Sequence, residues 1–101
     1  MSMVSEMIGK YVIVRSAKAG VFAGILSEKD GCDVVLTDCR RIWYWDGAAS
    51  ISQLATDGTK RPGNCKFTRT VSQIYISDVI EIIPTTDVAE KSIRGVAEWK
   101  V

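Results

Sequence analysis

The sequence predicts a mainly β protein with short helices, in which antiparallel strands curl into a small barrel. Runs rich in β-branched and aromatic residues recur between residues 10 and 39, separated by tight turns that contain glycine. Gly24 interrupts the second of these runs, and a glycine inside a strand indicates a bulge or a sharp bend. A further apolar pair of short runs follows at residues 74–83, and these can close the barrel.

The N-terminal half contains three predicted strands. Residues 2–9 are compatible with a short helical turn that begins at Ser2 and ends at Gly9. The strands are expected at residues 10–15, 21–28 and 32–37, and the third can continue through Cys39 into a run rich in arginine and tryptophan. Short turns between them make neighbouring strands antiparallel.

An insertion separates the two groups of strands. The barrel strands are predicted at about residues 10–45 and 65–83, with the insertion at about residues 46–64. Within it, Ile51, Leu54 and Ala55 have helical spacing, and Gly58 can end the helix. A basic turn follows at residues 60–64, and residues 66–71 alternate between polar and apolar side chains like a returning strand.

A helix is predicted close to the C-terminus, at about residues 86–95. Thr86 can cap its first turn, and Val88, Ala89 and Ile93 are expected to face inward. With no linker or repeat in the sequence, residues 1–101 are expected to form one domain.

The run from Cys39 to Trp45 is the strongest candidate for a functional surface. If it is extended, Arg41, Trp43 and Trp45 line one face, and the other face carries Arg40, Ile42 and Tyr44. A guanidinium beside indole rings can stack on a planar anionic ligand such as a nucleotide. The same residue types are enriched in protein interfaces, and on residue types alone a core cover or a subunit contact comes first.

Charge is concentrated in one part of the chain. The net charge is only +1, which argues against a protein that coats long nucleic acids by neutralising phosphates. Residues 39–70, however, carry six basic and two acidic side chains, a net charge of +4, whereas residues 71–101 have a net charge of −2. The positive charge therefore accompanies the tryptophans.

The sequence does not favour an enzyme, a metal site or a cofactor. It has no histidine, and its three cysteines form no Cys-x-x-Cys pair. Cys39, beside two arginines, could have a lowered pKa, but no base is identifiable near it. No apolar run is long enough for a membrane span, and no basic region precedes Glu6 as in a signal peptide, so residence in the cytoplasm without a membrane partner is expected.

Two regions of the sequence resemble Sm-like proteins. Residues 8–14, 20–26 and 34–39, with Asp30, are similar to the first signature of that family, and residues 74–82 are similar to the second. The resemblance implies a small antiparallel Sm-like or SH3-like barrel, here with a helix-containing insertion and a C-terminal helix. It also implies a homo-oligomeric ring in which the fourth and fifth barrel strands of neighbouring subunits pair.

The residues with which Sm-like proteins read RNA do not carry over. That family uses an asparagine after the second hairpin and an Arg-Gly pair before the last strand. At these places the present chain has Cys32-Asp33 and Tyr75-Ile76. The resemblance therefore implies the fold without supplying the binding residues.

A second resemblance spans nearly the whole chain. It rests on Ala19-Gly20-Val21, Gly24-Ile25-Leu26, the stretch 40–48 with Arg-Arg-Ile-Trp-Tyr-Trp-x-Gly-Ala, Gln53-Leu54-Ala55, Pro62 to Phe67, and Val79 to Pro84. This pattern is similar to a family of small tailed-bacteriophage proteins of unknown function. It implies a phage or prophage origin and expression in the cytoplasm of a bacterial host, and it assigns no activity.

Three binding functions remain open. The first, narrowly favoured, is capture of a small anionic nucleotide, for example a cyclic nucleotide that signals in host anti-phage defence. The second is binding of single-stranded RNA or DNA by an Sm-like oligomer, and the third is a protein-interaction role in the virion or in host takeover. The expected ligand-binding residues are Arg40, Arg41, Trp43, Tyr44, Trp45, Lys60, Arg61, Lys66 and Arg69.

Overall fold

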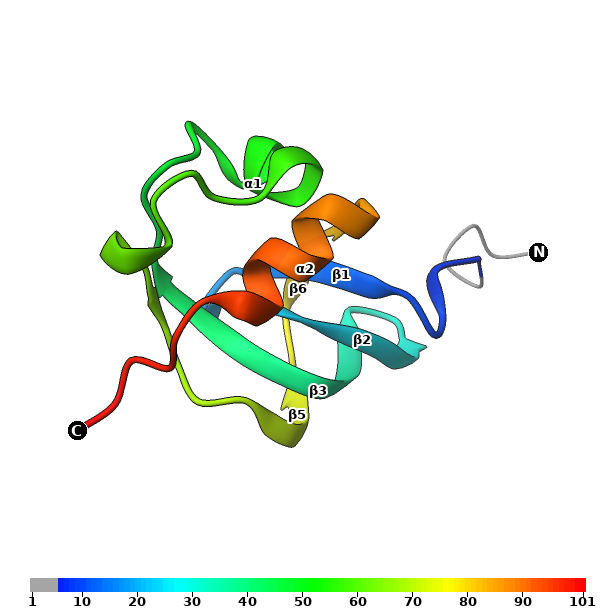
Figure 1. Cartoon of the computed structure of the whole chain (residues 1–101). Coiled ribbons are helices and arrows are strands. Elements are labelled where there is room, and N and C mark those ends of the chain that lie inside the picture. The colour runs from blue at the N-terminus through cyan, green and yellow to red at the C-terminus, as the bar shows by residue number, and fades with distance from the viewer. Residues whose placement is uncertain (1–5) are drawn as a thin grey trace.

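The computed structural model describes residues 6–101, which form an antiparallel sheet curled into a barrel, with two helices on one side (Figure 1). Strands β1 (Tyr11–Ser16), β2 (Gly20–Asp30) and β3 (Asp33–Tyr44) form a meander. This order confirms the three strands predicted from the N-terminal half, including the continuation of the third through Cys39. The expected cap at Ser2 lies outside the described residues.

The second half of the chain closes the barrel. It consists of α1 (Ile51–Asp57), the 3-10 turn η2 (Pro62–Asn64), β4 (Lys66–Phe67), β5 (Val71–Ile76), β6 (Val79–Pro84) and α2 (Asp87–Gly95). The strand order is β4-β3-β2-β1-β6, and β5 also pairs with β3. The first part of β3 pairs with β5 and its last residues pair with β4, so one long strand pairs with two successive strands of the second half.

A bulge lets β3 change direction. The β2–β3 register shifts between Ala23 and Ile25, so Asp38 and Cys39 stand opposite Gly24 alone. Asp38 adopts a φ of 49°, in the left-handed region. A Cβ atom on residue 24 would lie 2.3 Å from the Cβ atom of Cys39, which explains why this bend requires glycine. The bend predicted at this position is therefore confirmed.

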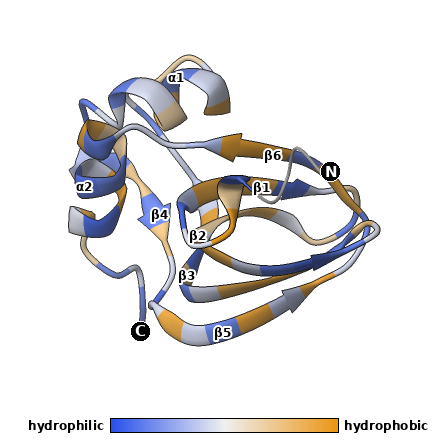
Figure 2. Ribbon diagram, turned by 90° about the vertical axis from the view of Figure 1, so that its right-hand side faces the viewer, coloured by the Kyte–Doolittle hydropathy of each residue, from blue (hydrophilic) through white to orange (hydrophobic). Residues whose placement is uncertain are grey.

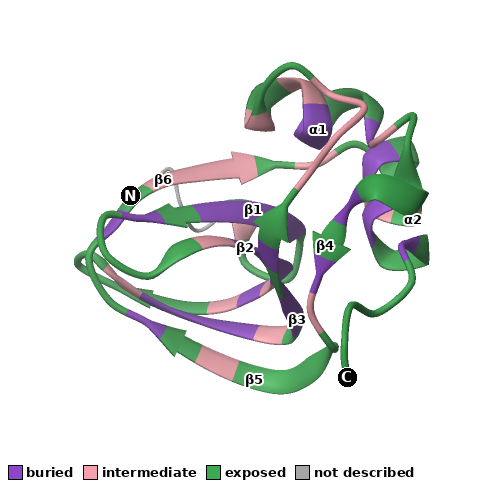
Figure 3. Cartoon of the chain, turned by 90° about the vertical axis from the view of Figure 1, so that its left-hand side faces the viewer, coloured by how far each residue is buried: buried purple, intermediate pink, exposed green. Residues whose placement is uncertain are grey.

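The sheet separates two hydrophobic clusters. One fills the barrel and includes Val12, Val14 and Phe22. The other lies between the outer face of the sheet and the helices, and includes Tyr11, Ile13, Leu54, Phe67 and Ile93. Buried residues accordingly run along β1 and β3 and along the inward sides of α1 and α2 (Figure 3). Because β1 contributes to both clusters, both of its faces are apolar.

Both predicted helices form, and the predicted end at Gly58 and the predicted cap at Thr86 are confirmed. The Ser50 hydroxyl accepts a hydrogen bond from the Gln53 amide at the start of α1, and Gly58 ends that helix with a φ of 76°. Thr86 caps α2 by accepting from the Ala89 amide. Ala89 is buried as expected, but Val88 is 66% exposed, so its predicted inward orientation is wrong. One position along a helix turns a side chain by about 100°, away from the sheet.

The strand predicted at residues 66–71 is shorter than expected. Only Lys66 and Phe67 pair with β3 as β4, and the chain then crosses to begin β5 at Val71. In residues 6–101, no helix has the length and apolar character needed to cross a membrane.

Candidate functional site

Two tryptophans distant in sequence form an exposed stacked pair. The ring centroids of Trp43 and Trp99 lie 6.4 Å apart, and the ring planes differ by 11°. Trp43 is 63% exposed and Trp99 is 48% exposed. The Lys66 ammonium lies 5.4 Å from the Trp99 ring centroid, within reach of a cation–π contact. We call Trp43, Trp99 and Lys66 the tryptophan platform.

The C-terminal tail carries Trp99 to this position. Residue Glu98 forms a parallel bridge with Phe67 of β4, and the Trp99 amide donates to the Phe67 carbonyl at 2.8 Å. The Glu98 carboxylate accepts from the Thr70 amide at 3.1 Å. The same carboxylate lies 3.9 Å from Arg69 and 3.8 Å from Lys100. The tail is thus held along β4 by both backbone and side-chain contacts.

Arg40 does not belong to a ligand-binding surface, which corrects the sequence prediction. Its side chain is 2% exposed and donates to four backbone carbonyls, those of Phe67, Thr68, Ile93 and Val96, at 2.8–3.1 Å. Burial lowers the pKa of its guanidinium, and nearby Tyr11 and Glu98 oppose that shift. An arginine keeps its charge in such a place, so Arg40 is a structural cation.

Trp45 is also separated from Trp43, contrary to the expectation that the two share a face. The β3–β4 register shifts between Ile42 and Tyr44, which interrupts the alternation of faces. Trp45 therefore packs, partly buried, against the same cluster as Ile42. Arg41 and Trp43 remain exposed, and the Arg41 guanidinium covers the Phe22 ring at 4.9 Å.

The other predicted site residues fall into two groups. Tyr44 is exposed and pairs across the strands with Lys66, and Arg69 reaches the tail through Glu98. Lys60 and Arg61 instead lie in the insertion, where the Lys60 amide donates to the Gly47 carbonyl and Arg61 pairs with Asp46 at 3.7 Å. The structure therefore brings Trp43, Tyr44, Lys66 and Arg69 together with the tail. Arg41 stays on β3 with its guanidinium over Phe22, and Lys60 and Arg61 lie elsewhere.

Sequence reasoning did not include the C-terminal contribution to this surface. Trp99, Glu98 and Lys100 were not among the predicted residues. The available signal was the third tryptophan of the chain, which stands between Glu98 and Lys100. Nothing local in the sequence indicates that residue 99 meets residue 43, because that contact depends on how the chain returns after α2.

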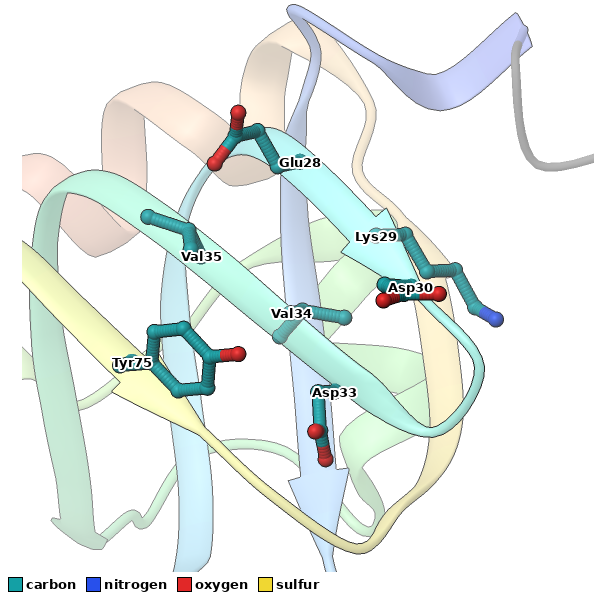
Figure 4. Close-up of a pocket in the computed structure, with 7 residues that line it drawn as sticks. All are labelled: Glu28, Lys29, Asp30, Asp33, Val34, Val35 and Tyr75. Carbon is teal, nitrogen blue, oxygen red and sulfur yellow. The ribbon is translucent and has the colours of Figure 1, made fainter.

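A cavity lies at the opposite end of β3 from the tryptophan platform. It has a volume of about 470 Å³, and the β2–β3 hairpin contributes Glu28, Asp30 and Asp33 to it, while Tyr75 comes from β5 (Figure 4). The Val79 amide donates to the Cys32 carbonyl at 2.8 Å and joins this hairpin to the β5–β6 turn. Three carboxylates against the single ammonium of Lys29 disfavour an anionic ligand at this end.

The end of the barrel with the basic residues is the end that carries the helices and the C-terminal tail. Helices α1 and α2, strand β4 and the C-terminus gather on one side of the barrel (Figure 2). Around the tryptophan platform lie Arg41, Arg69 and Lys100, with Glu98 as the one carboxylate in contact with them among residues 6–101. Charge is thus polarised along β3, from an acidic hairpin to a basic platform.

The Cys39 thiol is buried on β3, in surroundings that disfavour its thiolate form. Burial raises the pKa of the Cys39 thiol, and Asp38 adds to the effect, so the lowering by Arg40 and Arg41 considered from the sequence does not occur. In the part of the chain that the structure describes, no group of three or more potential metal ligands comes together.

Comparison with known proteins supports the fold and defines the family. The SmAP1 heptamer of P. aerophilum aligns with a TM-score of 0.53 and 21% identity, over 82% of this chain and 88% of that chain. A heptameric archaeal Sm protein aligns with the same TM-score and identity, over 82% of this chain and 96% of that chain. No curated protein matches the chain. Residues 9–93 match the DUF6948 family, so the protein belongs to this family, a domain of unknown function, and has an Sm-like barrel fold.

Proposed function

We propose that the protein is a non-enzymatic homo-oligomer that binds single-stranded RNA or DNA on the tryptophan platform. The observation that carries the proposal is the exposed, nearly parallel pair of Trp43 and Trp99 with Lys66 beside it. Exposed aromatic rings set among cations are the general means by which proteins hold unpaired bases and their phosphates. Leaving two indoles exposed has no benefit for folding alone.

The charges around the tryptophan platform suit a short stretch of single-stranded nucleic acid. Arg41, Lys66, Arg69 and Lys100 supply four cations against the single carboxylate of Glu98. Arg41 and Lys66 have no carboxylate within 4 Å among residues 6–101, and they remain available for phosphate. A protein of net charge +1 can therefore bind a few nucleotides without coating long nucleic acid.

The open surface of the platform favours binding of single-stranded nucleic acid over capture of a small nucleotide. Sites for small ligands are concave and usually bury about 70–90% of the ligand. The three cavities described, of about 470, 410 and 260 Å³, contain no tryptophan in their walls. A flat aromatic surface instead holds a base that a single-stranded nucleic acid presents to it. Capture of a small anionic nucleotide, favoured from the sequence, becomes the competing outcome of the experiment.

The sheet edges support a homo-oligomer. In residues 6–101, β5 pairs with β3 only and β6 pairs with β1 only, so each strand leaves its second edge without a strand partner. Tyr75 on β5 and Ile80 on β6 are exposed beside these edges. The two similar archaeal proteins are heptamers. Pairing of β5 with β6 of another copy would remove both edges.

The resemblance to small tailed-phage proteins further suggests that this assembly acts in the cytoplasm of an infected bacterium.

Fluorescence anisotropy with labelled ten-residue oligonucleotides, U10 and dT10, tests the proposal. Trp43→Ala should weaken binding about 5- to 150-fold, because one stacked base contributes roughly 1–3 kcal/mol. Lys66→Ala should weaken binding less and reduce the slope of log K against log salt by nearly one unit. Val88→Ala and Lys91→Ala, on exposed positions of α2, are the matched controls and should bind as the wild type does.

Cyclic dinucleotides and ADP-ribose, added as unlabelled competitors, separate the alternatives. Tight binding of these ligands with a shallow salt dependence, and no tighter binding of U10, would establish small-nucleotide capture instead. If neither class binds and Trp43→Ala alters only the oligomer, the platform is a protein interface.

A further inference from the structure

Arg40 connects the three chain segments that meet at the tryptophan platform. It lies on β3, three residues before Trp43. Its Nε atom donates to the Thr68 carbonyl at 2.9 Å, and Nη2 donates to the Phe67 carbonyl at 3.1 Å. Its Nη1 atom donates to the Ile93 carbonyl at 3.1 Å and to the Val96 carbonyl at 2.8 Å. The first two acceptors adjoin Lys66, and the last two precede Trp99.

One acceptor is common to Arg40 and to the platform. The Phe67 carbonyl accepts from Arg40 Nη2 at 3.1 Å and from the Trp99 amide at 2.8 Å. The position of the indole of Trp99 over Trp43 therefore depends on an oxygen that Arg40 also holds. The guanidinium further lies 5.5 Å from the Phe67 ring centroid, which fixes the direction of β4.

The chemistry of the contact requires a guanidinium. The acceptors lie on two segments, and the Ile93 carbonyl belongs to the last turn of α2, where its backbone partner is the Val96 amide at the long distance of 3.4 Å. The planar fork of arginine has five N–H donors and can reach all of them at once. The ammonium of lysine has three donors around one point, so it cannot span both segments.

We infer that Arg40 is a positioning residue for nucleic-acid binding: it does not touch the ligand, but it holds β4 and the C-terminal tail so that Trp99 and Lys66 lie against Trp43. This inference rests on the function proposed above. It also makes a prediction about the free protein, since the stacked pair of indoles should be lost when the guanidinium is replaced.

The test uses Arg40→Lys, which keeps the charge, and Arg40→Met, which keeps the length, each compared with the wild type well below its melting temperature. Near-UV circular dichroism of the free protein reports the Trp43–Trp99 stack. Both variants should lose the wild-type signal of the stack, with far-UV spectra that remain native. Leu36→Ala, in the barrel interior, is the matched control because it lowers the melting temperature without touching the platform.

Binding of U10 gives the second readout, in a double-mutant cycle with Trp99→Ala. Arg40→Lys should weaken binding about tenfold in the wild-type background and by a clearly smaller factor when Trp99 is already alanine, because only the displacement of Lys66 then remains. A native near-UV spectrum for Arg40→Lys, or an equal loss in both backgrounds, would overturn the inference. If U10 does not bind the wild type, the proposed function fails, and the spectrum of the free protein still decides the role of Arg40.

Discussion

Arg40 and Arg41 show how much the position of one residue decides in this protein. The two arginines are adjacent, yet one is buried against four carbonyls and the other lies on the surface. Successive side chains in a strand point to opposite faces. The outer face of β3 is covered by the α2 region, and Arg40 points there, where four backbone carbonyls replace the water that its charge loses.

Gly24 is a position at which the barrel has no room for a side chain. We expect Gly24→Ala to destabilise the protein by about 3 kcal/mol or more, at or above the upper end of the usual range for overpacking. A Cβ atom there would lie 2.3 Å from the Cβ atom and 2.9 Å from the Cα atom of Cys39, and backbone cannot move aside cheaply. Urea unfolding measures the effect. Gly95→Ala, with open space around its Cβ position, should stay within about 1 kcal/mol of the wild type. Equal effects of the two substitutions would contradict the packing at the bulge.

At the scale of elements, the insertion is organised around Asp46. Its carboxylate accepts from the Asn64 side-chain amide at 3.0 Å and from the Gly47 amide at 2.7 Å, and its carbonyl accepts from the Thr59 hydroxyl. These contacts join the two ends of the segment that contains α1 and η2. The hydrogen bond from Asn64 and then that from Gly47 lower the pKa of Asp46 below its ordinary value of 3.8.

This network predicts a pH dependence with a definite sign. Because the folded pKa is the lower one, ionised Asp46 contributes stability above pH 3.8, and that contribution is lost as the pH falls through the folded pKa. The wild type should therefore melt at a higher temperature than Asp46→Asn at pH 7, and the difference should shrink as the pH falls below 3.8. Thermal melts over this range measure it, with the exposed Asp57→Asn as control. A difference that stays constant with pH would show that the charge of Asp46 is not involved.

At the scale of the whole molecule, the open edges of β5 and β6 predict assembly. Tyr75 is 69% exposed and Ile80 is 57% exposed beside these edges, whereas Ile76 and Val79 lie in the barrel interior. Tyr75→Lys and Ile80→Lys should therefore reduce the oligomer without unfolding the barrel, because a charge on an edge strand opposes further pairing. Val88→Lys, on exposed α2, is the matched control and should assemble as the wild type does. Light scattering at micromolar concentration measures the mass, and a monomeric wild type would exclude the ring.

The barrel and its caps follow from local sequence signals. Strands β1, β2 and β3, the bend at Gly24, the end of α1 at Gly58 and the cap at Thr86 all appear where the sequence places them. Each depends on residues within a few positions of one another. Periodicity, turn residues and capping side chains report such local preferences directly.

The site depended on contacts that no local signal contains. The sequence determined that arginines and tryptophans would be concentrated on the third strand, and Arg41 and Trp43 are both exposed there. Only the tertiary structure decided that Arg40 is buried, that the bulge after Ile42 sends Trp45 into a core, and that Trp99 takes its place beside Trp43. Residues 43 and 99 meet because β4 and α2 return the chain to β3. This contact is stabilised by burial and by the Phe67 carbonyl, which accepts hydrogen bonds from two distant segments.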